Sequence, residues 1–233
     1  MGVASLAAPL ASPLGPVALP EGGTGPVTLL VALAAMSLLP FLLVTFTSFT
    51  KISVVLSLAR AALGTQQAPP TVVLTGLAAV LSLVVMGPVA EATWDRLRAE
   101  PLPPNPGPEL VRAVTAAAEP LRAFLVEHGS ADLRAELAAL ARELRGGAPV
   151  RETDLAVVAP AFVLSELKRA FQIGFVVFLP FLVVDMVVAN VLLALGMQSL
   201  SPSQVSLPFK VLLFVAVDGW ALLARSLLEG YGR

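Results

Sequence analysis

The feature that most constrains this chain is a set of four long apolar stretches. Each reaches the ~20 residues that a helix, rising about 1.5 Å per residue, needs to cross the hydrocarbon core of a bilayer. The sequence contains neither an internal repeat nor an extended strand-period segment, so it predicts an all-α fold with four transmembrane-like segments. These are Val27–Phe46, Val72–Ala90, Phe171–Met197 and Leu207–Leu228.

Composition supports a membrane setting and excludes several classes of function. Hydrophobic residues make up 57% of the chain and charged residues 13%, against roughly a quarter charged in soluble domains. The net charge of -1 provides no basic surface for nucleic acid. There is no cysteine and one histidine, which excludes disulfides and thiolate chemistry and disfavours an ordinary zinc site.

The apolar stretches divide the chain into four parts. Residues 1–25 lack Lys and Arg and predict a disordered, uncleaved lead-in, because a secretory signal begins with a basic region. Residues 26–90 form an N-terminal hydrophobic hairpin and 91–169 a hydrophilic helical insert. Residues 170–233 form a C-terminal hydrophobic hairpin whose connecting loop is a candidate gate.

The insert carries its own helix signals. Pro101–Pro108 predicts a stiff linker. A helical stripe follows, with Ser130 as its N-cap and Gly146–Gly147 as its stop. His128 is predicted to lie on the surface at the end of a preceding helix, where its protonated form complements the helix dipole. The stripe consists of Leu133, Leu137, Leu140 and Leu144.

Asp185 and Asn190 lie inside the third apolar stretch and point to different sides of it, about 140° apart on a helix. An acid at a helix centre costs about 2.5–3.5 kcal/mol on insertion scales. Such a group normally faces protein or a wet cavity. The segment is therefore expected to contact more than lipid.

Lys210 has two readings of equal weight. It pairs with Asp185, between helices or between subunits, where the pair would fix the register of an interface. Alternatively it extends from the start of its helix to the lipid headgroups. Lys51 and Arg60 are expected to be interfacial anchors or inter-subunit contacts.

The loop Gly196–Pro208 joins the last two stretches. In a single chain it is best explained as an ordinary turn with one buried methionine, Met197. If several copies meet there, Met197 and Gln198 could line a deformable constriction, since methionine re-packs easily.

Two rival classes fit part of the pattern. A secondary transporter or proton channel also places Asp, Asn and Lys within its spans, and such a protein usually has an internal repeat. An intramembrane hydrolase would need paired acids, and Asp185 and Asp218 are the acids within the stretches. No protease motif surrounds either one, so no enzymatic activity and no cofactor are expected.

Three stretches resemble the FliP/SctR family, the core export-apparatus proteins of bacterial type III secretion systems. They are FTSFTKISVVLSLARAALGTQQAPP (Phe46–Pro70), PAFVLSELKRAFQIGFVVFLPFLVVD (Pro160–Asp185) and LPFKVLLFVAVDGW (Leu207–Trp220). The segment ANVLLALGMQ and the absence of a predicted signal peptide resemble the injectisome branch of the family more than the flagellar branch.

The resemblance implies a multi-pass protein of the bacterial inner membrane. It also implies a pentamer-like ring of copies around a closed channel, displaced toward the periplasm, that admits unfolded export substrates. The implied partners are a small two-helix subunit (FliQ/SctS-like), a third subunit (FliR/SctT-like) and a larger export gate protein (FlhA/SctV-like).

Several residues match family positions with implied roles. Asp185 and Lys210 match an inter-subunit ion pair. Met197 matches the start of a Met-rich sealing loop; here Gln198 and Ser199 follow it, so sealing is expected to depend also on Leu200. Roles in assembly or packing are expected for Pro180, Glu166, Asn190, Asp218 and Trp220.

Overall fold

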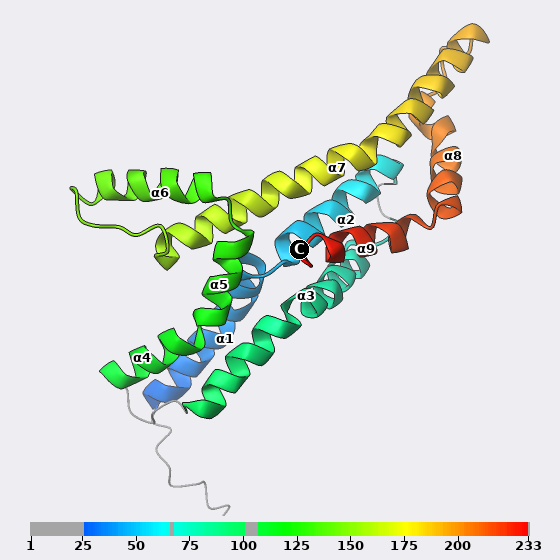
Figure 1. Ribbon diagram of the computed structural model, residues 1–233. Coiled ribbons are helices and arrows are strands. Elements are labelled where there is room, and N and C mark those ends of the chain that lie inside the picture. The colour runs from blue at the N-terminus through cyan, green and yellow to red at the C-terminus, as the bar shows by residue number, and fades with distance from the viewer. Residues whose placement is uncertain (1–25, 66–67, 101–106, 233) are drawn as a thin grey trace, which may run out of the picture. The chain divides into compact units, whose positions relative to one another are not determined.

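A computed structural model describes residues 26–65, 68–100 and 107–232. Within these ranges the protein is helical and contains no strand, which confirms the all-α prediction (Figure 1). The lead-in 1–25 and most of the linker 101–108 lie outside the described residues. The described helices are α1 (Pro26–Phe46), α2 (Phe49–Leu63), α3 (Thr71–Ala99), α4 (Pro108–Ala117), α5 (Glu119–His128), α6 (Ala131–Leu144), α7 (Leu155–Ala194), α8 (Pro202–Ala216) and α9 (Gly219–Glu229).

The chain divides into two compact units, with the boundary between Leu39 and Pro40 inside α1. Pro40 lacks a backbone N–H, so it removes one hydrogen bond from the helix at this point. The described part of the first unit is the beginning of α1, and the second unit contains all the helices that follow.

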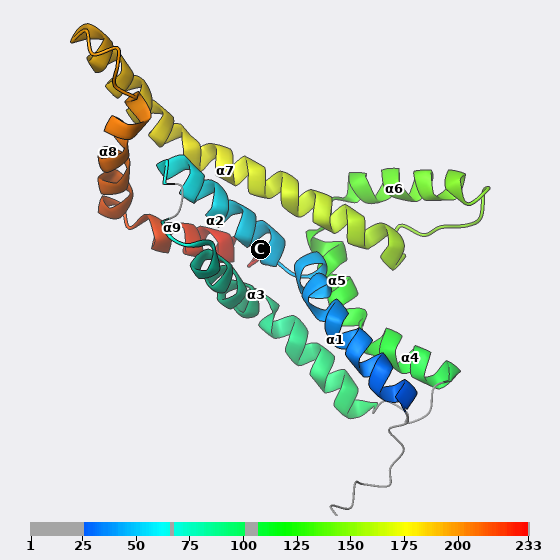
Figure 2. The same cartoon turned by 180° about the vertical axis from the view of Figure 1, so that it is seen from behind.

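Helix α2 is the centre of the second unit. Figures 1 and 2 show it lying along α7 on one side, with α3 and α9 close to it. Its fully buried side chains recur at the three- and four-residue spacing that places them on one helical face. The hydrophobic core follows from that periodicity; the buried positions are Ile52, Val55, Leu56 and Ala59.

Helix α5 packs against α3 and α7 in a second hydrophobic cluster of Phe124, Leu125, Val158 and Phe162. A third, smaller cluster joins α6 to the beginning of α7 through Ala138, Val150 and Val157. Helix α6 begins after Ser130, as predicted, but the Ser130 side chain makes no capping bond. The predicted leucine stripe packs only in part: Leu137 lies against the third cluster, whereas Leu140 and Leu144 are exposed.

Two helices, α3 and α7, are each long and apolar enough to cross a membrane. Two bent pairs raise the possible number to four: residues Pro40–Phe46 with α2, bent by 82°, and α8 with α9, bent by 58°. The fourth expected stretch, Leu207–Leu228, is thus not one straight helix. It breaks at Asp218, a non-glycine residue in the left-handed region at φ 50°.

The expected division of the chain at 90/91 and 169/170 falls inside helices α3 and α7. Helix α7 is 40 residues long. Its first part contacts α5 and α6 of the insert, and its last part contacts α8. One continuous helix therefore connects the insert to the C-terminal hairpin, and the four-part division stays a prediction.

Candidate functional site

Asp185 and Lys210 face each other across the hairpin formed by α7 and α8. The Nζ of Lys210 lies 2.6 Å from Oδ2 of Asp185, and Ser206 donates a hydrogen bond to Oδ1 at 2.5 Å. Lys210 also donates to the carbonyl oxygen of Ala62 at the end of α2, at 3.4 Å. The carboxylate thus accepts two hydrogen bonds, and one lysine joins three helices.

Of the two readings of Lys210, pairing is the one the structure contains. The lysine side chain is 6% exposed and that of Asp185 33%, so Lys210 does not extend away from the helices. Within the chain the pair joins two helices, because α8 folds back along α7. The inter-subunit pairing that the family resemblance implies stays a prediction.

The loop after α7 has a defined geometry. The N–H of Met197 donates to the carbonyl of Leu192 at 2.9 Å, and the N–H of Gly196 donates to that of Leu193 at 3.0 Å. With Gly196 in the left-handed region at φ 72°, this is a Schellman motif, which fixes where the chain leaves the helix. Met197 and Leu200 are each 47% exposed, and Gln198 and Ser199 are also exposed. The expectation of a buried methionine in this single chain is therefore wrong.

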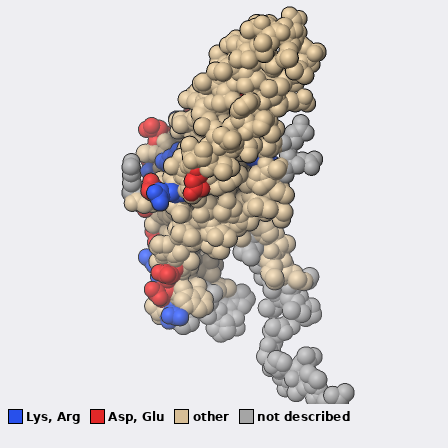
Figure 3. Space-filling model, turned by 90° about the vertical axis from the view of Figure 1, so that its right-hand side faces the viewer, with Lys and Arg blue, Asp and Glu red and all other residues tan. Residues whose placement is uncertain are grey.

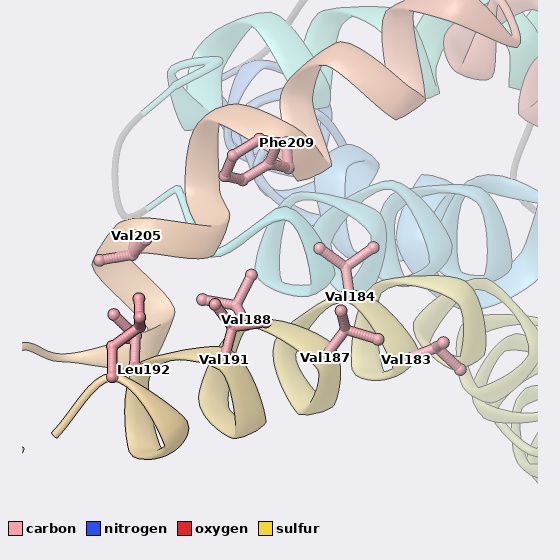
Figure 4. Close-up of a pocket in the computed structure, with 9 residues that line it drawn as sticks. Val183, Val184, Val187, Val188, Val191, Leu192, Val205 and Phe209 are labelled. Carbon is pink, nitrogen blue, oxygen red and sulfur yellow. The ribbon is translucent and has the colours of Figure 1, made fainter. Parts of the chain in front are cut away.

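An apolar groove of about 560 Å³ lies between α7 and α8 next to this loop. Val184 and Val188 project from α7 into the space that Phe209 borders from α8 (Figure 4). Its other lining residues are also apolar: Val183, Val187, Val191, Leu192, Leu195 and Val205. In Figure 3 the upper end of the visible face shows no Lys, Arg, Asp or Glu. The charged residues gather lower down.

The remaining predicted packing residues occupy different settings. Trp220 packs edge-on against Phe214, with ring centroids 5.0 Å apart, as a packing role requires. Asp218 is exposed at the break before α9, and Pro180 and Asn190 are exposed on α7. Glu166, in contrast, is fully buried.

Glu166 is the centre of a buried charged cluster. Its Oε1 accepts a hydrogen bond from Arg169 at 2.9 Å, and its Oε2 lies 3.5 Å from the Nζ of Lys51 on α2. The hydroxyl of Tyr231, beyond α9, also donates to Oε2. Lys51 is therefore an internal contact rather than an interfacial anchor, because it neutralises a carboxylate that has no exposed surface. Arg60 binds locally, to Pro69 and Thr71.

His128 lies next to this cluster and is buried, which corrects the prediction of a surface histidine. Its ring packs against Phe124 at 4.5 Å and against Tyr231 at 5.1 Å between centroids. Burial lowers the pKa of His128 below its usual value, because the imidazolium loses its hydration. Burial and the nearby Glu166 carboxylate raise the pKa of Tyr231, so its hydroxyl stays protonated.

The sequence contained a partial signal for this cluster. Glu166 and Arg169 stand three residues apart, so they share a helical face, and Lys51 is a charge within an otherwise apolar segment. Nothing in the linear order, however, brings Lys51, His128 and Tyr231 together. In the described part of the chain, no group of three His, Asp or Glu side chains lies close enough to hold a metal ion.

Comparison with known proteins identifies the family. Residues 32–227 match the FliP family. The hypersensitivity response secretion protein HrcR of Ralstonia nicotianae is 42% identical over 210 residues, covering 88% of this chain and 96% of the relative. The Yop proteins translocation protein R of Yersinia pestis is 43% identical over 209 residues, covering 88% and 96%. The flagellar biosynthetic protein FliP of Caulobacter vibrioides is 45% identical over 209 residues, covering 89% and 77%.

An all-helical fold with two to four helices long and apolar enough to cross a bilayer is typical of a helical membrane protein. The chain belongs to the FliP family of type III secretion proteins. This confirms the resemblance drawn from the three sequence motifs. Family membership and the apolar helices together indicate a protein of the bacterial inner membrane.

Proposed function

We propose that this protein is a core structural subunit of the type III secretion export apparatus, and that several copies form the entrance channel for unfolded polypeptides. The observation that carries the proposal is the α7–α8 hairpin. It presents an apolar groove and an exposed methionine and leucine at its tip, while the ion pair between its two helices is satisfied within the chain.

Exposed apolar side chains on this hairpin occur on more than one side. Phe175, Leu182, Val187 and Leu193 on α7 and Phe209, Leu212 and Val215 on α8 are all more than half exposed. Asn190 lies exposed among the apolar residues of α7, and an amide facing hydrocarbon is costly. A helix hydrophobic on all sides that also carries a polar group is typical of one buried among other protein subunits.

In the proposed ring, copies of the hairpin surround a pore and the loops of Met197 and Leu200 meet at its axis. A constriction of apolar side chains excludes ions by dewetting, and flexible side chains can move aside for a polypeptide. Gln198 and Ser199 lie between Met197 and Leu200 in the sequence of this loop. The assembled core would lie toward the periplasmic side of the membrane.

The proposed partners are a small two-helix subunit (FliQ/SctS-like), a third subunit (FliR/SctT-like) and a larger export gate protein (FlhA/SctV-like). We place the protein in the injectisome branch because its segment ANVLLALGMQ resembles that branch. Complementation separates the branches: a strain lacking an HrcR-type protein should regain secretion, whereas a strain lacking flagellar FliP should not regain motility. Restored motility without restored secretion would assign the flagellar branch.

The transporter alternative is weakened by the same geometry. Asp185 accepts hydrogen bonds from both Lys210 and Ser206, so its charge is already compensated within the chain. A proton- or ion-coupled site would need this carboxylate to exchange partners during a transport cycle.

Native mass spectrometry of the full chain in detergent tests the proposal. Expressed with its two small membrane partners, the protein should form a discrete ring that incorporates both. A monomer or dimer that ignores the partners, together with transport activity of the protein alone, would replace the channel-subunit proposal by the transporter.

A further inference from the structure

Tyr231 follows the last helix and contacts three elements that are far from it in sequence. Its hydroxyl donates to Glu166 on α7. The Nζ of Lys51 on α2 lies 3.5 Å from the centre of its ring. The ring also stacks on Phe124 of α5, with centroids 6.0 Å apart and an interplanar angle of 19°. It meets the ring of His128 edge-on.

These contacts connect the C-terminal hairpin to the helices of the insert. The apolar side chains of α9 share one cluster with α2 and α3, and Tyr231 adds contacts to α5 and to Glu166 of α7. A tyrosine suits such a position because its ring is apolar and its hydroxyl still finds an acceptor. The ring also faces a lysine, which adds a cation–π attraction.

His128 is the group of this site whose ordinary pKa lies nearest neutral pH, and burial lowers that pKa. The charged groups facing it are Lys51 from α2, Glu166 and Arg169 from α7, and Glu127 from its own helix. Helix α3 contributes apolar side chains to the same cluster, among them Met86 and Val89. Arg169 additionally donates to the carbonyl oxygen of His128 at 2.7 Å.

With His128 neutral, Lys51 and Arg169 together carry two positive charges around the single buried carboxylate of Glu166. Protonation of His128 would add a third cation beside these groups. Loss of hydration is the largest effect and lowers the pKa of His128; the carboxylates of Glu127 and Glu166 favour the protonated form, and the charges of Lys51 and Arg169 oppose it. An imidazolium is therefore better accommodated where water reaches it than where the Tyr231 ring covers it.

We propose that Tyr231 is a latch that holds the C-terminal end of the chain against the α2–α5–α7 junction, and that protonation of His128 releases it. At a pH low enough to protonate His128, the ring of Tyr231 leaves Phe124 and Lys51, and water enters beside His128. Release frees the end of α9 from the insert without breaking the Lys51–Glu166 contact. The latch thus makes the coupling between the C-terminal hairpin and the insert sensitive to acid.

The composition of the chain allows a direct test, because it contains one tyrosine and one histidine. Fluorotyrosine incorporation gives a single 19F resonance from position 231, and the imidazole protons give a single histidine signal. Both are followed in detergent micelles, with the full chain, between about pH 8 and about pH 5. The proposal expects the fluorine resonance to move to its solvent-exposed position with the same midpoint as the histidine signal.

Two variants separate the latch from general acid effects. His128→Phe keeps an aromatic ring at the site and should hold the fluorine resonance at its buried position throughout. Glu143→Gln, at an exposed carboxyl of α6, should leave the transition unchanged. A fluorine signal that stays fixed while His128 titrates overturns the proposal, and so does an unchanged transition in His128→Phe. Should His128→Phe fail to fold, the comparison of the two midpoints in the unmodified chain still decides.

Discussion

The Nζ of Lys210 on α8 lies 2.6 Å from Oδ2 of Asp185 on α7 and 3.4 Å from the carbonyl oxygen of Ala62 on α2. One ammonium group thus fixes the register of the hairpin and ties it to the central helix. Buried ion pairs contribute modestly to net stability, and their best-attested role is to select one arrangement over others.

Removing the lysine should therefore be more harmful than exchanging the pair. Lys210→Ala leaves Asp185 uncompensated and should destabilise the protein by about 2 kcal/mol, below the ~3–5 kcal/mol of fully buried pairs because Asp185 is 33% exposed. Thermal unfolding in detergent measures the loss. Lys210→Asp should fail in assembly and secretion, and adding Asp185→Lys should restore part of both. A double variant no better than the single one would contradict the pairing, and Asp95→Asn, at an exposed acid of α3, serves as the control.

Lys51 should be the more sensitive of the two buried lysines. Its partner Glu166 is fully buried, so Lys51→Met leaves a carboxylate held by Arg169 and Tyr231 alone and should cost about 3–5 kcal/mol. Adding Glu166→Gln should recover part of that loss, because the uncompensated charge is removed as well. Lys168→Met, at an exposed position of α7, should change stability little. Equal effects of Lys51→Met and Lys168→Met would refute an essential buried pair.

Gly219 and Gly76 form a matched pair of glycine positions. A Cβ at Gly219 would lie 2.2 Å from Cε2 of the buried Phe214 ring, whereas a Cβ at Gly76 meets nothing within 4 Å. Gly219→Ala should therefore displace Phe214 and destabilise the protein by about 1–3 kcal/mol. Gly76→Ala should leave stability unchanged or raise it, since alanine favours helix by roughly 0.5–1 kcal/mol over glycine. Denaturant or thermal unfolding of both variants measures the difference. A greater loss of stability in Gly76→Ala than in Gly219→Ala would contradict the prediction.

The proposed gate makes a prediction about ion leakage. Met197→Ser should raise the closed-state conductance of the assembled complex in planar bilayers, because a hydroxyl lets water occupy an apolar constriction. Leu200→Ser should add to the effect if both residues line the seal. Ser203→Ala, at an exposed position of α8, is the control. Unchanged conductance in the Met197→Ser and Leu200→Ser double variant would remove the loop from the gate.

Stability should fall in acid through His128. Burial lowers its pKa in the folded protein, so the unfolded chain binds the proton more tightly. The stabilising contribution is therefore complete above the unfolded pKa of about 6.5 and is lost as the pH falls through the lower folded pKa. The thermal midpoint of the unmodified protein should drop between about pH 7 and about pH 5 relative to His128→Phe. Parallel midpoints in the two proteins would show that His128 does not contribute.

Much of the helical architecture could be predicted from local sequence. The apolar stretches predicted α1, α3 and much of α7, because length and composition alone determine whether a helix can cross a bilayer. The insert helix α6 ends two residues before Gly146, which adopts the left-handed conformation expected of a helix stop. The serine and threonine residues before α2 bond back to helical carbonyls in part, as Thr47 does to Leu43.

The breaks within the apolar stretches were not predictable in the same way. The run Leu207–Leu228 is continuous in hydropathy, yet the chain turns at Asp218, and Gly219 then packs closely against Phe214. The pairing of Asp185 with Lys210 was inferred from charge in an apolar setting. Whether it would form within a chain or between chains depended on the direction in which α8 returns along α7.

Hydropathy, helix signals and long motifs are properties of neighbouring residues, so they predict an all-α membrane protein of the FliP family without any knowledge of the fold. The meeting of Lys51, His128, Glu166 and Tyr231 could not be predicted in this way. These four residues come from four separate segments. Their contact arises from the packing of α2, α5 and α7, which is set by the summed burial of many apolar side chains rather than by any local pattern.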